Sequence, residues 1–173
     1  MTVFNILGPS RPPGANAQVI GVYSRALVEP LARVLTELGT LRAFVVHGAD
    51  GLDEISNTGD SQISEVREGL VRTFTVRPEE FGLARASIAD LRGGDREQNA
   101  QIIRALLEGE PGARRDIVLM NAAAALVAGG RARDLKEGVG LAGRSIDGGA
   151  AGAKLQALVA LSQKLAGDRA VDK

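Results

Sequence analysis

A buried strand, an amphipathic helix and a second buried strand follow one another in the first third of the chain. The β-branched run Gln18–Tyr23 and the apolar run Leu41–His47 predict two short buried strands. Between them, apolar residues recur with a helical period from about Leu27 to Leu38, and Gly39 ends the pattern. This order is typical of a βαβ unit with parallel strands, so the chain is predicted to be an α/β protein.

The rest of the chain predicts a hairpin followed by helices. Two strand-like runs, Ile63–Glu68 and Leu70–Arg77, flank Gly69 and favour an antiparallel hairpin. Helical patterns then dominate, at Asp95–Leu107, Asp116–Ala128, Asp134–Asp147 and about Gly152–Leu165. We therefore expect a mostly parallel sheet with an antiparallel hairpin, flanked by helices, and a helical C-terminal portion. One domain is expected over residues 1–166, with a polar tail at 167–173.

Composition excludes several classes of function. The chain has no cysteine, which excludes disulfides, thiolate metal sites and cysteine nucleophiles. Its 21 basic and 21 acidic residues balance, which argues against a nucleic-acid surface or a basic membrane patch. No apolar run approaches the ~18 residues of a transmembrane helix, and the N-terminus lacks a signal-peptide pattern. We expect a soluble, cytoplasmic protein without nucleic-acid or membrane partners.

The strongest chemical feature is the acid-rich stretch that follows the second predicted strand. Asp50, Asp53 and Glu54 surround Gly51 where a parallel strand ends, which is where open α/β sheets place ligands. Mg²⁺ is usually held by one or two carboxylates together with substrate phosphates and water. Asp53 and Glu54 are therefore candidate metal ligands, although spacing alone favours an Asp–Gly turn with solvated acids.

Three further features have simpler structural interpretations. His47, the single histidine, is more typical of a satisfied buried group than of a general base. The Gly94–Asp95 pair opens a helix, where the aspartate is expected to act as a cap rather than leave the backbone free for phosphate. Gly8 and Pro9 form a turn that would allow close backbone approach to a flat ligand, but the residues alone favour a simple turn.

The order and spacing of these motifs resemble anthranilate phosphoribosyltransferase along nearly the whole chain, from about Thr2 to about Leu165. The matching segments are Thr2–Pro9, Val45–Gly48, Asp50–Ser56, Gly93–Asp95, Asn99–Ala100 and Asn121–Leu126. Of these, the Asp-Gly-Leu-Asp-Glu stretch is specific within this fold. The resemblance implies the α/β domain of that family.

The resemblance implies a function for the candidate residues. The family transfers the phosphoribosyl group of phosphoribosyl pyrophosphate to the amino nitrogen of anthranilate in tryptophan biosynthesis. Its acid pair helps to hold Mg²⁺, a role that falls here on Asp53 and Glu54. Gly8 and Pro9 match a segment that lines the family's anthranilate channel, so they are candidate substrate-binding residues. The resemblance also allows a homodimer of the full-length enzyme.

Two departures from the family separate the hypotheses. The turn at Gly8 and Pro9 continues into Ser10–Pro13, where the family usually has Leu-Thr-Asn-Pro, and this difference changes the local loop. Family members are also about twice this length, and the apolar start at Thr2 is typical of a chain entered in mid-fold. We therefore expect the C-terminal part of the enzyme's α/β domain over residues 1–166. Three hypotheses remain: an incomplete enzyme, a non-catalytic ligand- or partner-binding module, and one half of a split enzyme.

Overall fold

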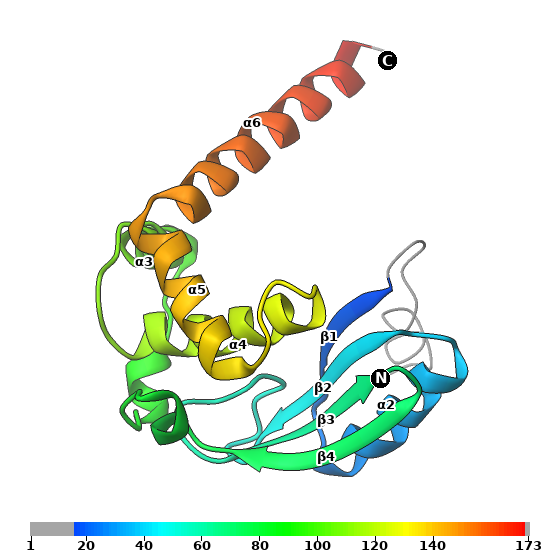
Figure 1. The fold of residues 1–173 in the computed structure, drawn as a ribbon. Coiled ribbons are helices and arrows are strands. Elements are labelled where there is room, and N and C mark those ends of the chain that lie inside the picture. Colours follow the sequence, from blue (N-terminus) through cyan, green and yellow to red (C-terminus); the bar gives the residue numbers. More distant parts are fainter. Residues whose placement is uncertain (1–15, 172–173) are drawn as a thin grey trace.

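A mixed four-stranded sheet forms the centre of the molecule (Figure 1). The computed structural model describes residues 16–171, with side chains up to Ala166. The strands lie in sequence order and are β1 (Ala17–Gly21), β2 (Arg42–Gly48), β3 (Ser61–Arg67) and β4 (Leu70–Val76). β1 pairs with β2 in parallel, with Val19 opposite Phe44, while β2–β3 and β3–β4 are antiparallel pairs. The α/β class, the parallel pair and the hairpin are as predicted.

The expectation of a mostly parallel sheet is wrong for the described strands, because two of their three pairs are antiparallel. The reason lies in the connection between β2 and β3. Residues 49–60 form a loop that contains no helix, and a parallel return to the same end of the sheet needs a crossover, usually helical. The chain instead turns back on itself and adds β3 as an antiparallel neighbour.

Helices cover both faces of the sheet. The α-helices of the described chain are α2 (Val28–Glu37), α3 (Arg96–Leu107), α4 (Ala113–Ala128), α5 (Leu135–Asp147) and α6 (Ala150–Val171), of which α2 covers one face and α4 and α5 lie over the other. Short 3-10 helices add η1 (Arg25–Leu27), η2 (Pro78–Phe81) and η3 (Ile88–Leu91). The predicted helices are all present, but α4 begins three residues early and α6 continues past the predicted end at Leu165. None of the helices within residues 16–171 is long and apolar enough to cross a membrane.

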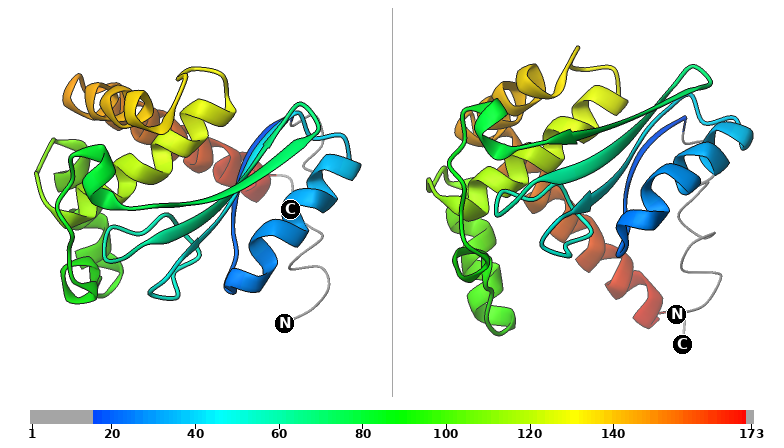
Figure 2. Two further views of the ribbon diagram at one scale, coloured as in Figure 1. Left: turned by 60° about the horizontal axis from the view of Figure 1, so that its bottom comes forward. Right: turned by 90° about the horizontal axis from the view of Figure 1, so that it is seen from below.

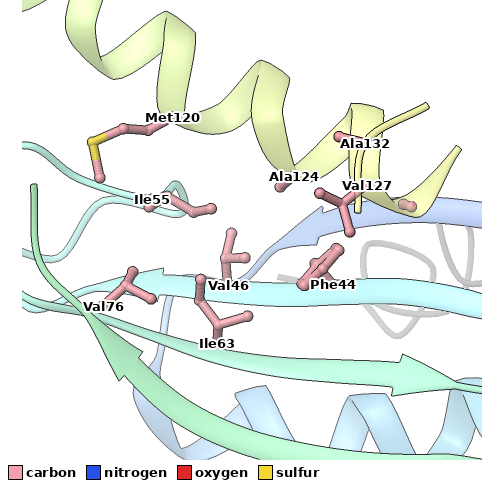
Figure 3. Close-up of a cluster of buried hydrophobic side chains, with 10 residues drawn as sticks. Phe44, Val46, Ile55, Ile63, Val76, Met120, Ala124, Val127 and Ala132 are labelled. Carbon is pink, nitrogen blue, oxygen red and sulfur yellow. The ribbon is translucent and has the colours of Figure 1, made fainter. Parts of the chain in front are cut away.

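The two faces of β2 contribute to two separate cores. Ala43 and Val45 pack with α2, whereas Phe44 and Val46 point to the opposite face and pack beneath α4 (Figure 3). Two further views of the ribbon show α2 on one side of the sheet and α4 and α5 on the other (Figure 2). Burial on both faces explains why the β2 sequence is continuously apolar instead of alternating.

Helix α4 packs between the sheet and helix α5. Its alanine run lets α5 approach closely, since a Cβ placed on Gly138 of α5 would lie only 2.8 Å from the Cα of Ala123. The sequence predicts this close packing from the run of small side chains. Packing on both sides fixes the position of α4 relative to the loop between β2 and β3.

Candidate functional site

The acid-rich loop leaves the carboxyl end of β2 and folds back over the end of β1. A tight turn begins it, in which Gly48 N–H donates to Leu52 O at 2.8 Å and Gly51 N–H donates to Gly48 O at 2.9 Å. Gly51 has a φ of +94°, a conformation that side chains of other residues rarely allow. The turn thereby directs the following residues back across the sheet edge.

Gly21 at the end of β1 allows the loop to come this close. A Cβ at Gly21 would lie 1.6 Å from the backbone oxygen of Asp53, which is far inside any permitted contact. Asp53 therefore sits directly against the carboxyl end of β1, in a loop that starts from the carboxyl end of β2. This is the edge at which α/β sheets place their ligands.

The three carboxylates of the loop take two different roles. Asp50 bonds within the loop: its Oδ2 accepts hydrogen bonds from the hydroxyls of Ser56 and Thr58, and its Oδ1 accepts from Leu52 N–H at 3.1 Å. Burial raises the pKa of Asp50, but the hydrogen bonds from Ser56 and Thr58 outweigh it and lower the pKa overall. Asp50 is thus engaged in holding the loop together.

Asp53 and Glu54 remain exposed to solvent. Partial burial of the carboxyl, followed by the negative charges of Asp53 and Asp50, raises the pKa of Glu54. Such mutual repulsion means that a cation placed at the pair would be favoured electrostatically. Within residues 16–166, no three acidic or histidine side chains converge into a complete metal site. Two carboxylates nevertheless suit Mg²⁺, which completes its coordination with water and phosphate oxygens.

A residue that sequence reasoning did not single out as part of the site holds the loop from the other side. Asn121 of α4 accepts a hydrogen bond from Ile55 N–H and donates one to Ile55 O, both at 2.9 Å. Ile55 directly follows Glu54. The available signal was a lone asparagine inside the otherwise apolar stretch of residues 117–128 of this helix, but its partner lies 66 residues away in the sequence.

His47 and Asp95 have the structural roles expected from the sequence. His47 is buried, and its Nδ1 lies 2.7 Å from the backbone oxygen of Val22. A carbonyl oxygen only accepts, so Nδ1 carries the proton in this hydrogen bond. Asp95 caps α3 by accepting from Gln98 N–H at 2.8 Å. Gly8 and Pro9 lie outside the described residues.

Comparison with known proteins shows the family of the chain. Residues 1–152 match the family model described as "Glycosyl transferase family, a/b domain". The chain belongs to this family. It is 54% identical over 162 residues to an anthranilate phosphoribosyltransferase of Rhodopseudomonas palustris, covering 93% of the chain and 48% of the relative. A Geobacter sulfurreducens relative of the same name is 54% identical over 164 residues, covering 94% and 47%.

Solved structures with the same fold carry the same name. The crystal structure of anthranilate phosphoribosyltransferase from Thermus thermophilus matches with a TM-score of 0.83 at 42% identity, over 92% of this chain and 47% of that one. The Saccharomyces cerevisiae enzyme "in complex with PRPP and Mg" matches with a TM-score of 0.72 at 30% identity, over 86% and 44%. The chain therefore spans about half the length of the relatives it matches.

Proposed function

We propose that this chain forms part of an anthranilate phosphoribosyltransferase, which transfers the phosphoribosyl group of phosphoribosyl pyrophosphate to the amino nitrogen of anthranilate. The observation that carries the proposal is the pair Asp53 and Glu54, exposed at the carboxyl ends of the two parallel strands. It occurs in a chain that is 54% identical to enzymes of that name. In this reaction the ribose C1–oxygen bond to pyrophosphate breaks and a C1–nitrogen bond forms.

The residues of this chain would serve the pyrophosphate side of the reaction. Asp53 and Glu54 would hold Mg²⁺, and the metal, when bound, neutralises charge on the departing pyrophosphate. A related yeast enzyme has been crystallised with Mg. Asp50 would keep the loop in the conformation that presents the pair, and Gly8 and Pro9 would contact anthranilate. The contribution of the chain is positioning and electrostatics.

The surface of α6 favours an enzyme portion over a freestanding module. The helix runs away from α3 and α5, and each described side chain from Gln156 to Ala166 is exposed (Figure 1). Among them, Leu158, Leu161 and Leu165 are more than half exposed. A freestanding binding module would be expected to present a polar face here. The cytoplasmic location and the homodimer of the full-length enzyme stay predictions that rest on the sequence.

Calorimetry with phosphoribosyl pyrophosphate tests the proposal directly. Titration into the chain should give heat that requires Mg²⁺ and that is lost in the double variant Asp53→Asn/Glu54→Gln. The matched control is Glu108→Gln/Glu110→Gln, which removes two exposed acids between α3 and α4 and should behave like the unmodified chain. Equal heats in the two double variants would contradict the proposed role of the acid pair.

Activity is tested separately by supplying the remainder of the enzyme. A second polypeptide, corresponding to the half of the relatives that this chain does not match, is co-expressed with it. Formation of phosphoribosyl anthranilate by the pair, but not by the chain alone, would identify an incomplete or split enzyme. Absence of turnover despite stable co-purification would favour the non-catalytic module.

A further inference from the structure

Asn121 is the one uncharged polar side chain of α4, and it makes three hydrogen bonds. Its Nδ2 donates to Ile55 O and to Ile117 O of the preceding helical turn, each at 2.9 Å, and its Oδ1 accepts from Ile55 N–H at 2.9 Å. Both backbone groups of Ile55 are thereby paired with one side chain. The amide acts on the loop much as a neighbouring strand would.

Ile55 is anchored through its side chain as well. It is 1% exposed and lies between the sheet and α4, in the same core cluster as Val46 and Met120 (Figure 3). The backbone and the side chain of Ile55 are therefore both attached to α4. Glu54 directly precedes Ile55 in the chain. The position of α4 therefore fixes the position of the Glu54 backbone.

The acid pair is consequently held at both ends. On the N-terminal side, Asp50 accepts a hydrogen bond from Leu52 N–H at 3.1 Å, and on the C-terminal side, Asn121 pairs with Ile55. Asp53 and Glu54 are the two residues between these anchors, and their side chains are exposed. Ligands fixed before a cation arrives need not be ordered on binding, which increases affinity.

We propose that Asn121 is a positioning residue, which fixes the backbone of Ile55 and so preorganises Asp53 and Glu54 for a divalent cation. The proposal rests on the metal role given above to the acid pair. Asn121 itself need not touch the cation. Its removal deletes no carboxylate and changes no charge, so any loss of affinity reports on the geometry of the pair.

Asn99 offers a matched control within the same chain. Its amide makes the same pair of bonds to the backbone of Gly94, accepting from the N–H at 2.9 Å and donating to the oxygen at 3.0 Å, at the start of α3. Asn121→Ala and Asn99→Ala therefore each remove a pair of hydrogen bonds to the backbone of one loop residue, and Asn121→Ala also removes the bond to Ile117 O. Only the first place adjoins the acid pair.

Binding of Mn²⁺ alone, followed by electron paramagnetic resonance, is the test. Mn²⁺ takes the same oxygen ligands as Mg²⁺. Loss of partners that orient metal ligands typically weakens binding about 10–100-fold, and we expect a loss at the lower end of that range for Asn121→Ala. Asn99→Ala should bind as the unmodified chain does. In a Glu54→Gln background, Asn121→Ala should have little further effect, because its action passes through the pair.

A milder variant guards against a folding defect. Asn121→Ser places a hydroxyl that can bond back to Ile117 O within the helix, while it is too short to pair with Ile55. It should weaken Mn²⁺ binding as Asn121→Ala does, with the far-ultraviolet circular dichroism unchanged. Unaltered affinity in a folded Asn121 variant, or absence of Mn²⁺ binding to the unmodified chain, would overturn the proposal.

The outcome is separable from that of the proposed function, because no phosphoribosyl pyrophosphate is present. If Mn²⁺ binds and the Asn121 variants weaken it, the positioning role stands even where the chain gives no heat with phosphoribosyl pyrophosphate. If Mg²⁺-dependent heat is seen and is the same in Asn121→Ala, the positioning role fails and the proposed function stands.

Discussion

Two glycines of α5 allow the packing of α4 and α5 to be tested with a single added methyl group. Gly138 is buried against α4, where a new Cβ would lie 2.8 Å from both the Cα and the Cβ of Ala123 and 3.0 Å from its oxygen. Gly140 lies two residues along the same helix and is exposed, with only the end of the Arg144 side chain 3.7 Å from its Cβ position. The same substitution, glycine to alanine, therefore places a methyl group against a neighbouring helix at Gly138 and beside only the end of a flexible side chain at Gly140.

The expected effects follow from two opposing contributions. Replacing glycine by alanine inside a helix stabilises by about 1 kcal/mol, which is the whole effect expected at Gly140. At Gly138 the carbon contacts would be shorter than the usual ~3.5–4.0 Å. The helices must then separate by roughly 1 Å, and overpacking of this kind costs about 1–3 kcal/mol. The helix gain is common to both variants, so they should differ by the overpacking cost of about 1–3 kcal/mol, and Gly138→Ala should be the less stable of the two.

Thermal unfolding followed by circular dichroism measures the difference. For a chain of this size, 1 kcal/mol shifts Tm by about 2–4 °C, so a difference of about 1–3 kcal/mol should separate the two variants by roughly 2–12 °C. Urea unfolding should rank them in the same order. A Gly138→Ala variant that is as stable as Gly140→Ala would refute the close α4–α5 contact, and with it the view that α4 is a firm support for Asn121.

Three further predictions concern the loop and the core. Asp53→Asn should lower the pKa of Glu54 toward its ordinary value by removing a negative neighbour, measured by carbon-13 NMR titration of the side-chain carboxyl. The pKa of Asp50 is lowered in the folded chain, so its contribution to stability is present above the unfolded pKa of about 3.9 and is lost as the pH falls through the folded pKa. In urea unfolding, Asp50→Asn should therefore destabilise the protein at neutral pH and leave a smaller further loss between pH 5 and pH 3 than the unmodified chain shows. Leu35 is fully buried against the sheet, so Leu35→Ala should cost about 2–5 kcal/mol, while Val34→Ala at its 41% exposed neighbour should cost far less.

Local sequence patterns predicted the elements well because each pattern depends on near neighbours. The apolar period of α2 and the cap at Asp95 are determined within one or two helical turns. The hairpin of β3 and β4 turns at Gly69, whose φ of +83° suits glycine. The direction of β3 relative to β2 was harder to predict from the sequence, because it depends on the path of the loop between them, which contains no helix.

The acid-rich loop shows the same division. Its residue types and its place after a strand predicted a candidate metal site at Asp53 and Glu54, while the hydrogen bonds from Ser56 and Thr58 to Asp50 were not visible in the spacing. In the sequence the three carboxylates look equivalent. In the folded loop, Asp50 accepts hydrogen bonds from Ser56, Thr58 and Leu52, whereas Asp53 and Glu54 are the exposed pair against the end of β1.

Thus the sequence alone determined the α/β class, the positions of the strands and helices, the family resemblance and the acid pair. Tertiary structure alone decided that Gly21 lies beneath Asp53, 32 residues later in the chain by their numbering, and that Asn121 pairs with Ile55 across 66 residues. The physical reason is that these contacts join segments whose separation is set by the packing of whole elements. Side-chain chemistry can be recognised locally, but the geometry that makes a site comes from helix α4 and the sheet together.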